Sequence, residues 1–211
     1  LDSAVVLSLC VKSLGTGMVR GLYMPERDSS RRHARLAELA AGHAHIQLEV
    51  YDITGALEEL GCYQGSVARA TGHSSINRIV YRSLELFSSA DPYLTTLRGS
   101  NSAVLRRSVS FFRIKHRIRM ALLFSIAETR GLLVVGCLNK SERAVGLFVP
   151  HGDSAAHIAP LADLYKTQVT GLARHISIPS QIIEVPPTPD LIPGINDAAV
   201  LGLEYPKLDR I

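Results

Sequence analysis

An acidic residue and a hydroxyl residue stand at the start of the chain, immediately before a segment with helical periodicity. Asp2 and Ser3 precede apolar residues spaced as on one face of a helix, and Gly15 follows the last of them. Amide groups at a helix start are unpaired and the helix dipole is positive there, so this position suits a polyphosphate with a metal ion. The same pair also suits a simple N-cap. By itself, the pair leaves both interpretations open.

Three polar segments in the second half of the chain contain further residues able to contact phosphate or metal. Residues 134–142 read V-V-G-C-L-N-K-S-E, residues 163–169 read D-L-Y-K-T-Q-V, and residues 187–191 read P-T-P-D-L. Asn139 and Glu142 also have the spacing of a helix capping box. A ligand role for Glu142 is compatible with capping, because helix starts also collect ligands.

Clusters of basic residues favour an anionic ligand. The chain carries 23 Lys+Arg against 19 Asp+Glu, and its basic residues gather locally. Aromatic residues make up only 6% of the chain, Trp is absent, and the basic clusters are not interleaved with aromatics, so we expect no nucleic-acid partner. The clustered residues are Arg31, Arg32, Arg106, Arg107, Arg113, Lys115, Arg117 and Arg119.

The composition is that of one soluble globular domain, or at most two. The chain has 211 residues, of which 46% are hydrophobic and 20% charged. No run approaches the roughly 18 consecutive apolar residues that a membrane span requires, and no leader-like segment opens the chain, so no membrane association is expected. Its three cysteines are widely spaced without a C-x-x-C pair, which argues for a reducing compartment. We therefore expect a cytoplasmic protein.

Strand and helix patterns alternate along much of the chain, which predicts an α/β fold. This rhythm is typical of a parallel sheet with crossover helices. We expect helices over residues 2–14 and 31–41, the second capped within 28–30, and strands over residues 18–24, 45–51 and 132–136, the last of them a continuous buried run.

A long helix is expected over residues 102–128, basic in its first half and apolar in its second. Such a helix can lie across a subunit or domain contact. Residues 61–100 are rich in turn formers and carry only one further candidate helix, over 76–87. Beyond Glu142, frequent prolines predict ordered loop around a single helix over 165–175.

The order and spacing of the polar segments resemble the ammonia-dependent NAD synthetase family. That family carries S-G-G-x-D-S, A-R-x-R-M, G-T-G-N-K-S-E, G-D-G-x-A-D, D-L-Y-K-T-Q-V and P-T-A-D-L, and counterparts occur here in the same order. The resemblance covers the chain except about residues 55–112. It implies a single domain over 1–211 that begins inside the pyrophosphatase loop, without S-G-G. It also implies an open, mostly parallel sheet with flanking helices, of the adenine-nucleotide alpha-hydrolase type, with ATP at the carboxyl ends of the strands.

The resemblance implies a two-step ligase. The carboxylate of deamido-NAD attacks the α-phosphate of ATP, pyrophosphate leaves, and ammonia then displaces AMP to give the amide. Charge accumulates on phosphate oxygens in this chemistry, so magnesium, cationic side chains and loop amides should carry it rather than a side-chain nucleophile. The family also implies a homodimer, for which the long helix is the candidate contact.

Position by position, the resemblance assigns roles to eight residues. Magnesium would be held by Asp2 and Glu142. ATP would be contacted by Asp2, Ser3, Cys137, Lys166 and Thr188, and deamido-NAD by Arg117 and His157.

Each of these roles has a plain structural alternative. Lys166 could be an ordinary solvated lysine, Arg117 part of a surface charge stripe, and Thr188 a turn residue between prolines. A transition-metal site built from His151 and His157 is not expected, because the family has no metal there. Cys137 is not expected to be a nucleophile, because nothing in the sequence supplies a neighbouring base.

The chain departs from the family motifs at several substrate-binding positions. Cys137 and Leu138 replace the Thr and Gly of G-T-G-N-K-S-E, and Pro150 and His157 replace a lysine and an aspartate that the family uses on deamido-NAD. Two rival functions therefore stay open. One is an adenylating ligase for a different carboxylate, and the other is a nucleotide-binding protein without turnover.

Overall fold

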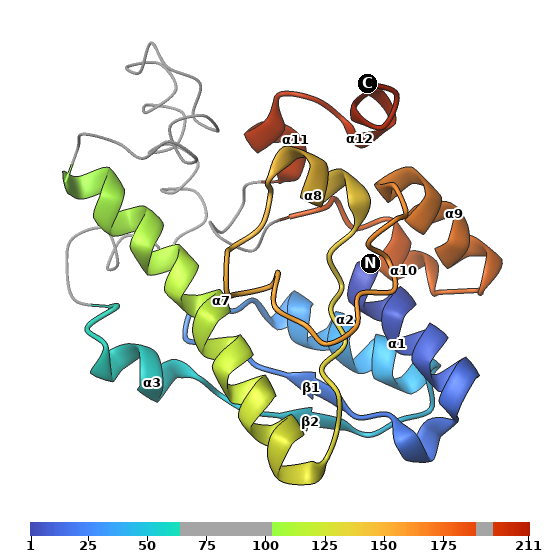
Figure 1. The fold of residues 1–211 in the computed structure, drawn as a ribbon, viewed down its shortest axis with the longest axis horizontal. Coiled ribbons are helices and arrows are strands. Elements are labelled where there is room, and N and C mark those ends of the chain that lie inside the picture. The colour runs from blue at the N-terminus through green and yellow to red at the C-terminus, as the bar shows by residue number, and fades with distance from the viewer. Residues whose placement is uncertain (64–102, 189–195) are drawn as a thin grey trace.

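Residues 1–63, 103–188 and 196–211 are described in the computed structural model of the chain (Figure 1). The first part contains α1 (Asp2–Leu14), the 3-10 helix η1 (Thr16–Met18), β1 (Gly21–Tyr23), α2 (Arg31–His43), β2 (Leu48–Val50) and α3 (Thr54–Glu59). The rest contains α7 (Ala103–Arg130), α8 (Lys140–Val145), α9 (Lys166–His175), α10 (Ser180–Ile183), α11 (Asp197–Leu201) and α12 (Tyr205–Leu208). The helix expected over 76–87 lies outside the described residues.

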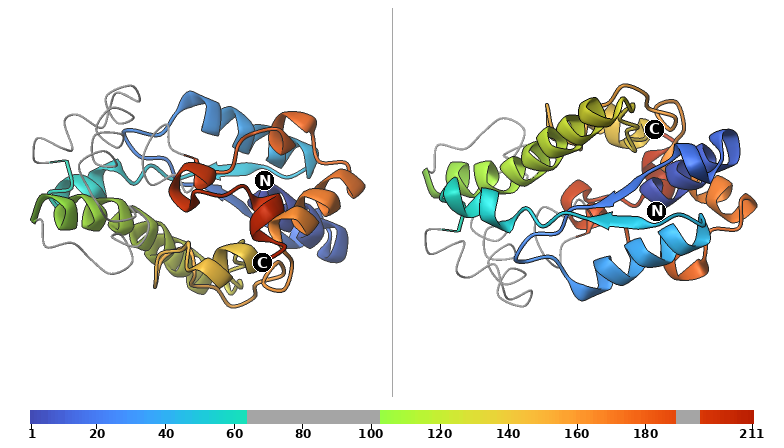
Figure 2. Two further views of the ribbon diagram at one scale, coloured as in Figure 1. Left: turned by 90° about the horizontal axis from the view of Figure 1, so that it is seen from above. Right: turned by 90° about the horizontal axis from the view of Figure 1, so that it is seen from below.

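The two strands form a parallel pair between layers of helices. Gly21 lies opposite Leu48 and Tyr23 opposite Val50, while α2 lies on one side of the pair and α7 on the other (Figure 2). This arrangement confirms the α/β class. Both strands are shorter than expected, since the region of Met18 turns into η1 and the chain becomes extended only afterwards.

The buried strand expected over residues 132–136 is wrong. In the described residues this run makes only an isolated parallel bridge, between Val135 and Ile158. The amide of Leu132 bonds back to the carbonyl of Ala127 at 2.8 Å, so the run begins by closing the end of α7. Leu133 is 63% exposed as a result. Helix termination uses the amide of Leu132, and in the described part of the chain only residues 134–136 of this run pair with a neighbouring segment, at 157–158.

The expected helices occur with nearly the expected bounds. α1 spans Asp2–Leu14, and the amide of Gly15 at its end bonds to Val11. α2 is capped by the Ser30 hydroxyl, which accepts a hydrogen bond from the amide of His33 at 3.2 Å. α7 continues to Arg130. Among the described residues, none of the helices is both long enough and apolar enough to cross a membrane.

The region beyond Glu142 contains more helix than its prolines indicated. The expectation of a single helix there is wrong, because α10, α11 and α12 accompany α9. Pro179 is the N-cap of α10, and Pro206 lies in the first turn of α12. Proline is tolerated at these positions because the first helical amides have no intrahelical partner. In this region, prolines therefore lie at helix starts as well as in the loops between helices.

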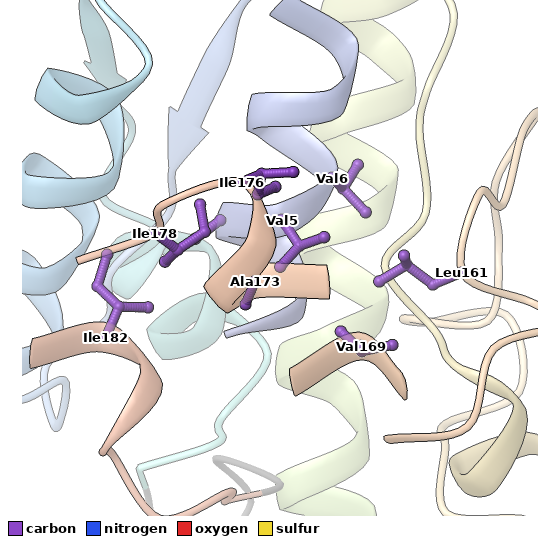
Figure 3. Close-up of a cluster of buried hydrophobic side chains, with 9 residues drawn as sticks. Val5, Val6, Leu161, Val169, Ala173, Ile176, Ile178 and Ile182 are labelled. Atoms are coloured by element: carbon purple, nitrogen blue, oxygen red, sulfur yellow. The ribbon is translucent and has the colours of Figure 1, made fainter. Parts of the chain in front are cut away.

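The hydrophobic core packs α1 against α9. Val5 of α1 and Ala173 of α9 are fully buried and lie beside each other (Figure 3). A fully buried valine side chain contributes about 1.5–3 kcal/mol. Because Asp2 precedes Val5 by one helical turn and Lys166 is the first residue of α9, this packing brings the two polar ends together. The core residues are Ala4, Val5, Val6, Leu161, Val169, Ala173, Ile176, Ile178 and Ile182.

A buried ion pair joins the loop after β1 to α7. The Lys115 ammonium lies 2.8 Å from Oε1 of Glu26, and both side chains are about 5% exposed or less. The hydroxyl of Tyr63 and the amide of Asp28 donate to the other oxygen of Glu26, at 2.8 and 3.0 Å. Burial alone would raise the pKa of Glu26, but the bonds from Lys115 and Asp28 outweigh it and hold the pKa below its usual value.

We expect Lys115→Met to lower the free energy of unfolding by about 3 kcal/mol or more, because it leaves the Glu26 carboxylate buried without its counter-ion. Urea unfolding measures the change. The double variant with Glu26→Gln should recover most of the loss. Arg130→Ala is the matched control, since it breaks an exposed pair with Glu49 and should change stability much less. Equal effects of Lys115→Met and Arg130→Ala would contradict this account.

Candidate functional site

A cleft of about 310 Å³ opens where the N-terminus of α1 meets the first residues of α8 and α9. Its apolar side is formed by β1, α2 and α10, through residues such as Leu36, Ala40 and Ile182. Its polar side contains five residues that the sequence predicted for the site. It also contains one acidic residue that the sequence did not assign to any site. Together these are Asp2, Ser3, Glu142, Lys166, Thr188 and Asp197.

Lys166 is the centre of this polar side. Its side chain is 6% exposed, and its ammonium donates to Oδ2 of Asp2 and lies 3.4 Å from Oε1 of Glu142. Burial disfavours the charged form, but the carboxylates of Asp2 and Glu142 outweigh burial and raise the pKa of Lys166. Lys166 is therefore a buried, charged lysine fixed by two carboxylates, and its interpretation as a solvated side chain is wrong.

Asn139 orients both carboxylates. This fully buried side chain donates from Nδ2 to Oδ1 of Asp2 at 3.2 Å and accepts from the amide of Glu142 at 3.0 Å. The amide of Asn139 in turn donates to Oε2 of Glu142 at 3.2 Å. These bonds complete the capping box of α8. One oxygen of Glu142 caps the helix while the other faces Lys166, so capping leaves a ligand role possible, and that role stays a prediction.

The surroundings of Glu142 favour its neutral form. Burial and the neighbouring charge of Asp2 raise the pKa of Glu142 to about 7, against the opposing effect of Lys166. With two carboxyl groups around one ammonium, the cluster contains more acidic than basic groups. This imbalance would not exist if the cluster were only a structural salt bridge with matched charges.

Asp209 fixes the start of α9 and was missed by sequence reasoning. One of its oxygens accepts from the Ser141 hydroxyl at 2.5 Å, and the other accepts from the amide and hydroxyl of Thr167 at 2.9 and 2.7 Å. Ser141 also accepts from the amide of Lys166 at 2.8 Å. Asp209 thereby links the residues next to Glu142 and Lys166. No local signal marked it, because it lies 42 and 68 residues from its partners.

Cys137 packs against the hydrophobic core beside α1 and α9. Burial, followed by the charge of Asp2, raises the pKa of its thiol to about 12. The thiol is therefore neutral near pH 7, which is the opposite of what a nucleophile needs. Cys137 does not belong to the described lining of the cleft, and its contact with ATP stays a prediction.

Arg117 and His157 both lie outside the described lining of the cleft. The guanidinium of Arg117 donates to the carbonyl of Pro150 at 3.2 Å, and Nδ1 of His157 accepts from the amide of Val134 at 2.9 Å. The ring of His157 also lies 4.9 Å from that of Phe124, between centroids. The substituted positions Pro150 and His157 are thus tied into the local structure. Their role toward deamido-NAD stays a prediction.

The oxygen donors at the cleft fit magnesium. This hard cation prefers oxygen ligands and is commonly bound through one or two carboxylates together with substrate phosphates, which Asp2 and Glu142 can provide. A carboxylate oxygen of Asp197, Oδ1, is buried without a hydrogen-bond partner in the described structure. Among the described residues, no three or more His, Cys, Asp or Glu side chains are placed to hold a metal ion by themselves. The same is true of the described residues around His151 and His157.

Comparison with known proteins decides the family. The NAD synthase family model matches residues 1–77 and 91–211. The chain belongs to the NAD synthase family. The NH3-dependent NAD+ synthetases of Thermotoga neapolitana and Thermotoga maritima are each 42% identical to it over 212 residues, covering all of this chain and 73% and 75% of those proteins.

A solved structure supports the same relationship for this NAD synthase family member. The NMN synthetase from Francisella tularensis is 25% identical, and it superposes with a TM-score of 0.72 over 99% of this chain and 71% of that chain. The family and the adenine-nucleotide alpha-hydrolase type of α/β fold, both expected from the motifs, are confirmed. The motif at residues 187–191 is described only to Thr188, since 189–195 lie outside the described residues.

We expect Asp209→Ala to lower kcat for product formation about tenfold or more, because small misplacements of catalytic groups are costly. The KM for ammonia should change much less, since Asp209 acts only through Lys166 and Glu142. Steady-state kinetics measures both, and Asp209→Asn, which keeps one acceptor oxygen, should recover part of the rate. Glu204→Ala, an exposed acid on the same segment, is the control. A melting temperature lowered with kcat unchanged would show a role in stability alone.

Proposed function

We propose that the chain is an ammonia-dependent NAD synthetase, an amide-forming ligase that uses ATP. The observation that carries the proposal is the buried Lys166 between the carboxylates of Asp2 and Glu142, in a cleft that also contains Thr188. Relatives that are 42% identical along the whole chain carry that activity in their names. The arrangement is therefore supported both by its own geometry and by the family.

The reaction has two steps. A carboxylate oxygen of deamido-NAD attacks the α-phosphorus of ATP and the bond to pyrophosphate breaks, giving an acyl adenylate. The nitrogen of ammonia then attacks the carbonyl carbon, AMP departs with the electron pair of the acyl–phosphate anhydride bond, and the nitrogen loses a proton to water. Both steps place charge on phosphate oxygens, which a fixed cation stabilises most when water is excluded.

The residues of the cleft match this demand. The Lys166 ammonium is preorganised by two carboxylates, so it is available to phosphate oxygens without a large rearrangement. Asp2 and Glu142 would hold magnesium, which when bound neutralises phosphate charge and orients the triphosphate. Ser3 lies in the first turn of α1, where helix amides favour an anion, and Thr188 also lines the cleft. The apolar side suits the adenine ring.

A related carboxylate substrate is the second candidate. It is favoured by Pro150 and His157, which replace dinucleotide-binding residues of the family, and by the structural similarity to an NMN synthetase. Amide formation measured with deamido-NAD and with the corresponding mononucleotide acid separates the two. A higher kcat/KM for the mononucleotide would establish this candidate in place of the first.

Assembly and location belong to the same proposal. We propose a single domain over residues 1–211, because one core joins α1 to α9 and α10. All three cysteines are free, which is consistent with a cytoplasmic location.

We also propose a homodimer in which α7 lies at the contact. Leu122 and Ile126 of α7 are only half-buried, and Leu133 just beyond it is 63% exposed. Sedimentation at micromolar concentration should give a dimer, and Leu133→Asp should weaken it without lowering the melting temperature, since that side chain is already in water. Monomer alone in the unchanged protein would exclude this assembly.

Lys166→Ala and Glu142→Ala should each lower kcat/KM for ATP by about 10²-fold or more, because both groups act where charge develops. Pyrophosphate release and amide formation measure this effect. Lys207→Ala removes an exposed lysine and serves as the control. Variants of Lys166 and Glu142 with near-normal rates would remove these residues from the mechanism.

A further inference from the structure

Asp197 is a buried acid at the cleft whose second oxygen has no partner. It is the first residue of α11 (labelled in Figure 1), is 3% exposed, and lines the same cleft as Asp2, Glu142 and Lys166. Its Oδ2 accepts from the Tyr205 hydroxyl at 2.7 Å, and its amide donates to the carbonyl of Pro187 at 2.9 Å. Its Oδ1 is buried and makes no hydrogen bond in the described structure.

A buried carboxylate oxygen without a hydrogen-bond partner destabilises the folded chain. The carboxyl group is nevertheless held in place, since Tyr205 fixes one oxygen and the bond to Pro187 fixes the backbone. A side chain held rigidly with one acceptor left over is typical of a site whose partner arrives with a ligand. The missing partner must be a hydrogen-bond donor.

The charges around Asp197 indicate which donor fits. Asp2, Glu142 and Asp197 supply three carboxyl groups, whereas Lys166 is the only lysine or arginine among the described lining residues. A donor carried by a cation relieves both the missing hydrogen bond and the excess negative charge. An anionic phosphate oxygen beside Asp197 would add negative charge and would supply no hydrogen-bond donor.

Direct binding of a metal by Asp197 does not fit the geometry. The described residues contain no set of three acids, histidines or cysteines placed around one ion. Magnesium, however, usually keeps several of its water molecules when proteins bind it, and those waters are strong donors. A water molecule bound to an ion at Asp2 and Glu142 can therefore donate a hydrogen bond to Asp197 even though the ion does not contact Asp197.

We propose that Asp197 is an outer-sphere residue of the magnesium site, with Oδ1 accepting a hydrogen bond from a water molecule on the ion held by Asp2 and Glu142. This inference rests on the proposed function, because it requires the ion at those two carboxylates. Outer-sphere partners affect metal affinity by about 10–100-fold. Tyr205 then has a positioning role, since it holds Asp197 toward the ion's hydration shell.

Mn²⁺ binding in the presence of a non-hydrolysable ATP analogue, followed by electron paramagnetic resonance, tests the proposal without turnover. Asp197→Asn keeps an oxygen to accept from Tyr205 but places an amide where an acceptor is needed. We expect its affinity for Mn²⁺ to fall about tenfold or more. Glu204→Gln, an exposed acid on the same segment, should bind Mn²⁺ as the unchanged protein does.

The outcomes separate this inference from the proposed reaction. Unchanged Mn²⁺ affinity in a folded Asp197→Asn protein overturns the inference. If the same variant also has a raised KM for ammonium, ammonium is identified as the donor instead. If Asp197→Asn does not fold, Asp197→Ser is measured with the same expectation. A parent protein that binds no Mn²⁺ refutes the metal site and this inference together. A parent protein that binds Mn²⁺ but makes no amide refutes only the reaction.

Discussion

The contact between Lys166 and the carboxylates of Asp2 and Glu142 is the interaction on which the site depends. It joins the first turns of α1, α8 and α9, which come from distant parts of the sequence. Three charged groups in a largely buried place lose much of their hydration, which is costly for any of them that is left unpaired. Pairing Lys166 with both carboxylates offsets part of that cost.

Apolar packing makes the contact possible. Val5 and Ala173 hold α1 against α9, and the polar ends of both helices follow from that arrangement. Asn139 then sets the finer geometry, because one fully buried amide bonds to Asp2 and caps the helix that carries Glu142. Core and site are therefore not separate parts of this fold, and a shift of α9 along α1 would displace Lys166 from both carboxylates.

The last sixteen residues close the site from a third direction. Asp209 bonds to α8 and to α9, whereas Asp197 connects the cleft to Tyr205 and to the loop of Pro187. Through Asp209, the C-terminal segment thus fixes the starts of α8 and α9 relative to each other. This role explains how short helices with little core of their own contribute to a ligand-binding cleft.

Local patterns determined much of this protein. The spacing of apolar residues and caps located α1, α2 and α7, and the motifs around Glu142 and Lys166 identified the family, because helix formation and motif chemistry involve neighbours a few residues apart. Where distant groups compete, local patterns failed. The run at 132–136 looked like a strand, yet its first amide closes α7, and two of the prolines beyond Glu142, Pro179 and Pro206, lie at helix starts.

The remaining features of the site were decided by tertiary structure alone. That Lys166 is buried and paired, that Asn139 reaches Asp2, that Asp209 holds Thr167, and that Asp197 has an oxygen left over all depend on side chains from separate elements meeting. The sequence specified which chemical groups were available, since residue type is local. The fold determined which of them share one cleft, because burial and pairing are properties of the packed chain.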